Sequence, residues 1–337
     1  MNKWECAKSG AEMEKTMNIA IISYWHVHAE GYTKEILEKS DSKVTAIWDV
    51  DIKRGMGYAE QFGATFYEDY DELLCDKSIE GVVITAATVD HTKLILKAIE
   101  AEKKVFSEKV LALTTAECLE IKEALEKKKG ELTLSLVKKC NSEFLFAKQM
   151  VSSGALGRIT YARMRNVHNG SIADWLPPHF YNKEQCGGGA MIDLGAHPMY
   201  LLNWFLGEPK TIQSVFTNIT GHEVEDNAVS VIEFEQGAIG VSETGFVSNY
   251  NPATLEISGT KGALLIRDGV KYALDETGGN WITVDELPKE LPSPLIQWVN
   301  GCVASKDVTF GIEDAVVLTR MMEAAYKSYE SGKREQV

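Results

Sequence analysis

Two histidines stand close together in the segment IISYWHVHAEGY, residues 21–32, directly after a short apolar run. Imidazole nitrogens at the spacing of His26 and His28 can bind one metal ion together. Local spacing places no third ligand beside them, and two ligands are insufficient for a metal site. The segment by itself therefore favours histidines that pack or form hydrogen bonds, and no metal is predicted.

A single carboxylate, Asp49, ends the apolar run of residues 43–48. A carboxylate at the end of such a strand can accept hydrogen bonds from the 2′-hydroxyl of an adenosine ribose, and it repels a 2′-phosphate. Asp49 therefore indicates NAD as cofactor, with NADP less favoured. The competing interpretation is a turn or helix-capping residue.

The elements that must position these residues alternate along the first part of the chain. Short β-branched runs predict strands, and amphipathic segments between them predict helices. Strands that are apolar on both faces and separated by helices indicate a doubly wound parallel sheet of the Rossmann type, with ligands outside the carboxyl ends of the strands. The expected strands are 17–23, 43–48, 81–85, 104–107 and 132–136, and the expected helices are 28–40, 52–62, 91–101 and 115–129.

The pattern changes after residue 140. A helix over 144–151 is followed by long strands in which polar and apolar residues alternate, and a final helix covers 312–328. This predicts an α+β domain with an open, largely antiparallel sheet. We therefore expect a flexible extension over 1–16, a dinucleotide-binding domain over 17–140, and a substrate-binding and oligomerisation domain over 141–337. An exposed sheet face predicts a homodimer or homotetramer.

The first crossover lacks the glycines of the dinucleotide fingerprint, which would stand near Ser23, Trp25 and His28. A diphosphate needs main-chain N–H groups at a helix N-terminus. Ser23 and a helix that begins near Val27 or His28 are expected to supply these groups. Tyr24, Trp25 and His26 are then expected to line the cofactor.

Composition narrows the class of protein. Of the 337 residues, 45% are hydrophobic and 25% charged, and the net charge of −14 argues against nucleic acid as a partner. The sequence contains no run of about 18 apolar residues, so no membrane span is predicted. The first sixteen residues lack the apolar region of a signal peptide, and none is expected. The six scattered cysteines are typical of reduced thiols, so we expect a cytoplasmic protein that acts on small molecules.

Two motifs make the chain similar to a known family. The segment 71–113 contains TAAT at 85–88, then His91, and then Glu108-Lys109-Val110. The segment GGGAMIDLGAHPMYLLNWFLG, residues 187–207, places Asp193 and His197 four residues apart. Together they resemble the glucose-fructose oxidoreductase and inositol dehydrogenase family (Gfo/Idh/MocA). The chain departs from the family at Val110, which replaces a proline, in the missing glycines, and at Tyr200, where an acidic residue is common.

The resemblance implies an NAD-dependent oxidoreductase that transfers a hydride between nicotinamide and a sugar, cyclitol or related polyol. Lys109 would hold the substrate hydroxyl or stabilise an alkoxide, His197 would be the base, and Asp193 would contact substrate or orient His197. Thr85, His91 and Glu108 would lie at the cofactor.

The second domain is expected to face the nicotinamide with residues that suit a polyhydroxylated ring. The candidates for substrate contact are His168, Asn169, Trp175 and His179.

Two other classes of function remain open. One is a redox-neutral glycosidase or epimerase of the same fold, in which tightly held NAD is regenerated in each cycle. The other is a cofactor-poor sugar-binding regulatory protein, which the missing glycines favour.

Overall fold

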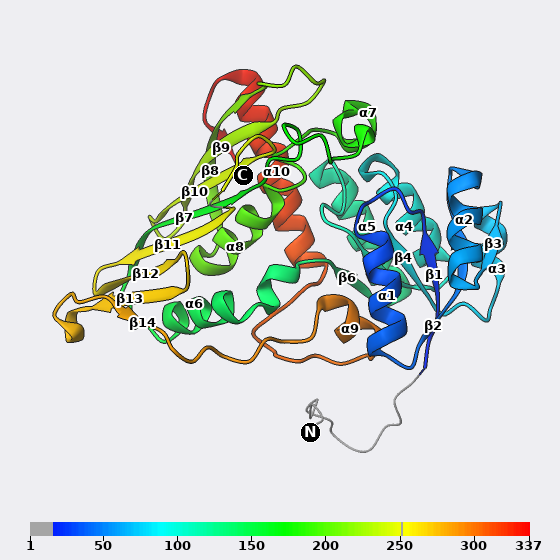
Figure 1. Ribbon diagram of the computed structural model, residues 1–337, viewed down its shortest axis with the longest axis horizontal. Coiled ribbons are helices and arrows are strands. Elements are labelled where there is room, and N and C mark those ends of the chain that lie inside the picture. Colours follow the sequence, from blue (N-terminus) through cyan, green and yellow to red (C-terminus); the bar gives the residue numbers. More distant parts are fainter. Residues whose placement is uncertain (1–15, 251) are drawn as a thin grey trace. The chain divides into compact units, whose positions relative to one another are not determined.

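The computed structural model describes residues 16–250 and 252–337, which form two units (Figure 1). The first unit runs to Val137 and also contains Pro292–Val316, and the second comprises Lys138–Leu291 and Val317–Val337. The first boundary is close to the expected one at 140/141. The return of Pro292–Val316 to the first unit differs from the expectation, which assigned these residues to the second domain. Of the predicted extension 1–16, only Thr16 is among the described residues.

The first unit contains a six-stranded sheet in the order β3-β2-β1-β4-β5-β6, and all of its neighbouring strands are parallel. This is the doubly wound order that binds dinucleotides, as the alternating pattern predicts. The short strand β3 was not expected. The strands are β1 (Asn18–Ile22), β2 (Lys43–Trp48), β3 (Thr65–Tyr67), β4 (Gly81–Ile84), β5 (Lys104–Ser107) and β6 (Leu132–Leu134).

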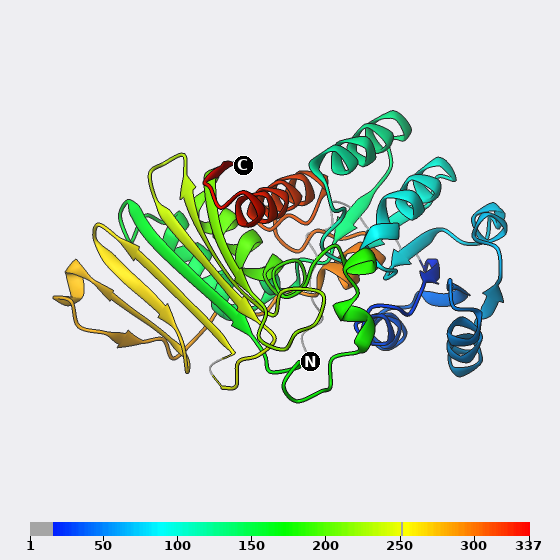
Figure 2. The same cartoon turned by 90° about the horizontal axis from the view of Figure 1, so that it is seen from above.

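Helices cover both faces of this sheet, which explains why its central strands are apolar on both sides (Figure 2). On one face α1, α2 and α9 share a hydrophobic cluster, to which α9 contributes Trp298 from far along the chain. On the other face α4 contacts both α3 and α5. The bounds are α1 (Ala29–Lys39), α2 (Ile52–Phe62), α3 (Tyr70–Cys75), η1 (Thr88–Asp90), α4 (His91–Glu100), α5 (Thr115–Lys128), η2 (Val137–Cys140) and α9 (Pro294–Val299).

The second unit contains a nine-stranded sheet in the order β14-β13-β12-β11-β7-β10-β9-β8-β15. β7 and β10 are parallel, and the other neighbouring pairs are antiparallel. The open, largely antiparallel sheet predicted from the alternating pattern is therefore present. Its strands are β7 (Ile159–Val167), β8 (Pro209–Thr217), β9 (Asn227–Phe234), β10 (Ile239–Gly245), β11 (Ala253–Gly259), β12 (Gly262–Ile266), β13 (Val270–Leu274), β14 (Ile282–Thr283) and β15 (Glu335–Gln336).

Helices α6, α8 and α10 lie on one face of the sheet (Figure 1). Gly240 of β10 shows how close they come, because a Cβ there would lie 3.3 Å from Leu206 of α8. On β8, Ser214 N–H donates to Ser328 Oγ of α10 at 3.0 Å. The helices are α6 (Ser142–Ser152), η3 (Pro178–Tyr181), α7 (Lys183–Cys186), α8 (Ala196–Leu206), η4 (Asp275–Thr277) and α10 (Ile312–Ser331), of which α10 begins in the first unit.

Two further expectations concern the whole chain. Within the part of the chain that the structure describes, no helix combines the length and apolar character needed to cross a membrane. Five cysteines are described, with no disulfide bond among the described residues, and Cys6 lies outside them.

Candidate functional site

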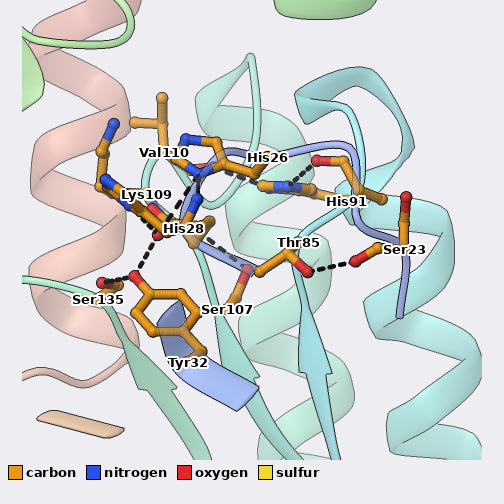
Figure 3. A network of polar contacts seen from close by, with 12 residues as sticks. Ser23, His26, His28, Tyr32, Thr85, His91, Ser107, Lys109, Val110 and Ser135 are labelled. Atoms are coloured by element: carbon orange, nitrogen blue, oxygen red, sulfur yellow. Dashed lines mark hydrogen bonds and ion pairs between the residues drawn. The ribbon is translucent and has the colours of Figure 1, made fainter. Parts of the chain in front are cut away.

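The first crossover keeps a glycine-like backbone without a glycine. Ser23, directly after β1, has φ +74°, in the left-handed region that favours glycine. Its carbonyl oxygen accepts a hydrogen bond from Thr85 Oγ1 at 2.6 Å, which joins the ends of β1 and β4 (Figure 3). The sheet order reverses between these two strands, so the turn lies at the switch point where doubly wound folds bind ligands.

The amides of this crossover are used inside the protein. Five N–H groups between Ser23 and His28 have an internal acceptor: Ser23 donates to Trp48 O, Tyr24 to Asp49 Oδ2, Trp25 to Ser23 Oγ, His26 to Thr85 O, and His28 to His26 Nδ1. The crossover therefore does not present the row of open amides that the sequence predicts for a diphosphate. Side chains accept three of these bonds, and one of the acceptors is Ser23 Oγ, at a position where the fingerprint has a glycine.

Asp49 is buried and fully engaged. Arg54, in the first turn of α2, donates to it from Nε at 2.8 Å and from Nη2 at 2.6 Å. The N–H groups of Tyr24 and Asp51 donate to the same carboxylate at 2.7 and 2.9 Å. Four donors occupy the roughly four lone-pair sites of a carboxylate. In this arrangement Asp49 caps its own turn and pairs with Arg54, so a bond to a ribose hydroxyl requires one of these donors to leave.

Tyr24 and Trp25, predicted at the cofactor, both lie in the interior. The ring of Tyr24 stacks on Tyr58 with 3.8 Å between centroids, and its hydroxyl is 2.8 Å from Thr33 Oγ1. Burial raises the pKa of Tyr24, although the bond to Thr33 acts in the other direction. The side chain of Tyr24 therefore belongs to the core.

Glu108 is the centre of a buried polar network at the end of β5 (Figure 3). Its Oε1 accepts from Tyr32 Oη and lies 2.8 Å from His28 Nδ1 and 3.9 Å from His26 Nδ1. Burial alone would raise the pKa of Glu108, but the neighbouring His26, His28 and Lys109 hold it well below its usual range. Glu108 is therefore a buried anion.

Lys109 follows Glu108 and is itself buried. Its N–H group donates to Glu108 Oε2 at 3.0 Å, and the Lys109–Val110 peptide bond is cis. His91 Nδ1 lies 2.9 Å from Val110 O, and Nε2 lies 3.1 Å from Ala86 O. His91 is 1% exposed, and its two ring nitrogens face carbonyl oxygens of the loop of Lys109 and of the loop after β4, so in this arrangement both nitrogens are occupied inside the protein.

The glycine run of the second unit is required by close packing. A Cβ on Gly188 would lie 1.9 Å from Tyr326 Oη, and one on Gly189 would lie 2.0 Å from Glu225 O. Glu225 Oε1 accepts from the N–H groups of Gly189 and Met191 at 3.0 and 2.9 Å and from Tyr326 Oη at 2.6 Å. This clamp holds the turn that leads to Asp193.

His197 is the second residue of α8, so Pro198 falls in the first turn of the helix, where proline is tolerated. Asp193 lies before the helix begins, and the two side chains are therefore not placed by one helical face. His197 Nδ1 is 2.9 Å from Tyr200 Oη, which also accepts from Lys138 N–H at 3.1 Å. The phenol can also accept from His197 Nδ1–H, and in that tautomer Nε2 of the neutral ring carries a lone pair.

Three of the predicted substrate residues gather at one end of β7. The ring of His168 stacks on Phe246 and lies 4.6 Å from that of Trp175. Asn169 Oδ1 accepts from Trp175 Nε1 at 3.4 Å, and the indole remains 54% exposed. His179 lies apart in η3, where its carbonyl oxygen accepts from Cys186 Sγ at 3.2 Å.

Several residues of these networks were not found from the sequence. They are Tyr32, Arg54, Ser135, Glu225 and Tyr326. The spacing of His28, directly before α1, and Tyr32, four residues later, was a usable signal, as was Arg54 in the first turn of the helix after Asp49. Glu225 and Tyr326 carry no local signal.

Comparison with known proteins adds family information. A family model described as "Oxidoreductase family, NAD-binding Rossmann fold" matches residues 17–135, and one described as "GFO/IDH/MocA C-terminal domain" matches residues 144–265.

Three individual proteins illustrate the similarity. An inositol 2-dehydrogenase of Salmonella paratyphi B is 25% identical over 252 residues, 70% of this chain and 72% of that protein. A D-glucoside 3-dehydrogenase of Escherichia coli K12 is 22% identical over 345 residues, 94% of this chain and 97% of that protein. The crystal structure of GenD2 from gentamicin A biosynthesis, in complex with NAD, has a TM-score of 0.81 at 22% identity and covers 98% of this chain and 99% of its own.

Proposed function

Because the chain belongs to the Gfo/Idh/MocA family of oxidoreductases, we propose that it transfers a hydride between NAD and a CH–OH group of a sugar, cyclitol or related polyol. The observation that carries the proposal is the position of Lys109. It is buried at the carboxyl edge of the parallel sheet, on a loop that His91 ties to the end of β4 beside the switch point. The named relatives that oxidise inositol and glucosides support the class of substrate.

The edge of the first sheet suits the adenosine part of such a cofactor. Val27, Val50 and Val89 follow the ends of the adjacent strands β1, β2 and β4, and they are 50%, 69% and 46% exposed. Exposed apolar side chains beyond the strand ends at a switch point suit a ligand-binding crevice. The diphosphate requires either amides released from their internal bonds or contacts with side chains of the crossover. NAD is favoured over NADP because the Asp49 carboxylate would repel a 2′-phosphate, and Arg54 is already paired with Asp49.

The chain's own residues supply the remaining chemistry. Nicotinamide, when bound, accepts or donates the hydride. The ammonium of Lys109 binds the substrate oxygen and stabilises its developing negative charge. His197 exchanges the hydroxyl proton, because its ordinary pKa lies near neutrality. Tyr200 orients the His197 ring through Nδ1, and Asp193 contacts the substrate or orients His197.

The substrate side of the proposal rests on the exposed indole of Trp175. Asn169 holds that ring through Nε1, and His168 packs beside it. A fixed aromatic face with amide groups at its edge suits the apolar face and hydroxyls of a sugar ring.

The engaged amides and the saturated Asp49 favour a second candidate, a sugar-binding regulatory protein that binds cofactor poorly. A single measurement, the affinity for NADH, distinguishes the two candidates. Titration with NADH, followed by nicotinamide fluorescence, is expected to show saturable binding that is tighter than for NADPH. No binding at millimolar NADH would leave only the second candidate.

A panel of sugars and cyclitols then tests the reaction. We expect stoichiometric formation of NADH from NAD with at least one member of the panel. Bond cleavage or epimerisation without net NADH would instead identify the redox-neutral class.

A further inference from the structure

Three potential metal ligands meet where the crossover after β1 passes over the end of β4. His26 N–H donates to Thr85 O at 3.0 Å, which carries the crossover across β4 toward the end of β5. There it reaches Glu108, 80 residues from His28 in the sequence. Figure 3 shows both imidazoles near Lys109, the residue that follows Glu108. Among the described residues, these three form the one group of histidine, cysteine or acidic residues whose ligand atoms come together, all within 4.8 Å of one another.

The separations suit a tetrahedral ion. Ligand bonds of about 2.0 to 2.1 Å place neighbouring ligand atoms roughly 3.3 Å apart around such a centre. Glu108 Oε1 lies 2.8 Å from His28 Nδ1 and 3.9 Å from His26 Nδ1, so the two distances bracket that value. Small rotations of the side chains would equalise them. An ion at His26 Nδ1 would take the lone pair that now receives His28 N–H.

A supporting shell already surrounds the carboxylate. Tyr32 Oη donates to Glu108 Oε1 and is itself 2.6 Å from Ser135 Oγ. Lys109 N–H donates to Oε2 at 3.0 Å. Such bonds fix the orientation of ligand side chains in metal sites. One imidazole remains accessible, since His28 is 44% exposed, and it offers a path for entry of an ion.

We propose that His26, His28 and Glu108 form a binding site for a divalent transition-metal ion such as Zn²⁺. Two neutral imidazoles and one carboxylate are a ligand set that proteins use for zinc, with the fourth position left to water or another oxygen ligand. The site goes beyond the proposed function, because it requires neither nucleotide nor polyol.

The test uses the untagged full chain after dialysis against a chelator. Titration with Co²⁺ is expected to produce the visible absorption bands of a tetrahedral ion at one equivalent per chain, and Zn²⁺ is expected to remove them. His28→Ala, at the accessible position, should weaken binding about 100-fold or more, since loss of even a second-shell partner costs about 10- to 100-fold. Tyr32→Phe should weaken it within that smaller range.

His222→Ala is the matched control, because this exposed histidine stacks on Tyr181 in the second unit and lies outside the cluster. It should bind Co²⁺ as the unchanged chain does. Glu108→Gln repeats the test if circular dichroism shows that it folds. Absence of the bands, or bands that persist unchanged in His28→Ala, would overturn the proposal. Because no cofactor is added, this failure is separate from failure of the oxidoreductase proposal.

Discussion

At the scale of single residues, Asp49 and His91 have the residue types of ligand contacts, yet their bonds serve the protein. Asp49 receives four donors from its own loop and from Arg54. His91 joins two carbonyl oxygens on neighbouring loops. Buried polar groups must find partners, and within a folded crossover the nearest partners are internal. Both residues therefore shape the edge of the sheet rather than line it.

Lys109 and His197 provide the prediction at this scale. We expect Lys109→Ala and His197→Ala each to lower kcat by about 100-fold or more, because they remove groups that act on the transferring proton and oxygen. The affinity for NADH should change little. Steady-state rates with the best polyol and fluorescence titration of NADH measure the two quantities separately.

Tyr200→Phe is the companion variant, because it removes only the hydroxyl beside His197 Nδ1. It should lower kcat less than His197→Ala and leave the affinity for NADH unchanged. Equal losses of turnover and NADH affinity in the two alanine variants would contradict the assigned roles.

At the scale of elements, the glycine run of the second unit shows how one turn is built from distant parts. Gly188 and Gly189 have no room for a Cβ because Tyr326 of α10 and the chain at Glu225 lie against them. The side chain of Glu225 then caps the turn through two amides and the Tyr326 hydroxyl. The position of the turn before α8 thus depends on α10, which is far away in the sequence.

The clamp predicts a pH dependence of stability. Burial raises the pKa of Glu225 above its ordinary 4.5, against the opposing effect of its hydrogen bonds. A raised folded-state pKa contributes stability that is fully present below the unfolded pKa and is lost as pH rises through the folded pKa. Glu225→Gln keeps the Oε1 acceptor but cannot ionise.

Urea unfolding of the unchanged chain and of Glu225→Gln, between about pH 4.5 and about pH 8, measures this pH dependence of stability. The unfolding free energy of the unchanged chain, relative to Glu225→Gln, should fall with rising pH, with a slope of at most about 1.4 kcal/mol per pH unit, and then level off. A difference that is constant with pH would show that Glu225 does not titrate in this way.

At the scale of the whole molecule, one sheet face offers a surface for self-association. Register places the exposed Val215, Val229 and Val231 on the same face, on β8 and β9. Beside them on that face Arg163 pairs with Glu243 at 2.6 Å. Apolar side chains next to ion pairs are typical of protein interfaces.

We therefore expect a homodimer or homotetramer whose subunits contact each other through this face. Val229→Lys should shift the molar mass, measured by light scattering after size exclusion, toward the monomer. Leu119→Lys is the control, since this exposed leucine lies on α5 of the first unit. A monomeric unchanged chain, or an oligomer insensitive to Val229→Lys, would exclude this face.

The sequence by itself determined the architecture of both units. The alternation of apolar runs with amphipathic segments predicted five of the six parallel strands, and β2 and α2 have their predicted bounds. Hydrophobic periodicity is a local property, so it indicates which face of an element is buried and which class of sheet results. The family motifs likewise led to Lys109, Asp193 and His197.

Only the tertiary structure decided which side chains meet. Glu108 joins His28 across 80 residues, Trp298 of α9 returns to the core of the first unit, and Tyr326 reaches Gly188. Periodicity shows that a residue is buried but not against which partner, because the partner depends on the path of the whole chain. For the same reason, the sequence left His26 and His28 without a third ligand, and folding brings them to Glu108.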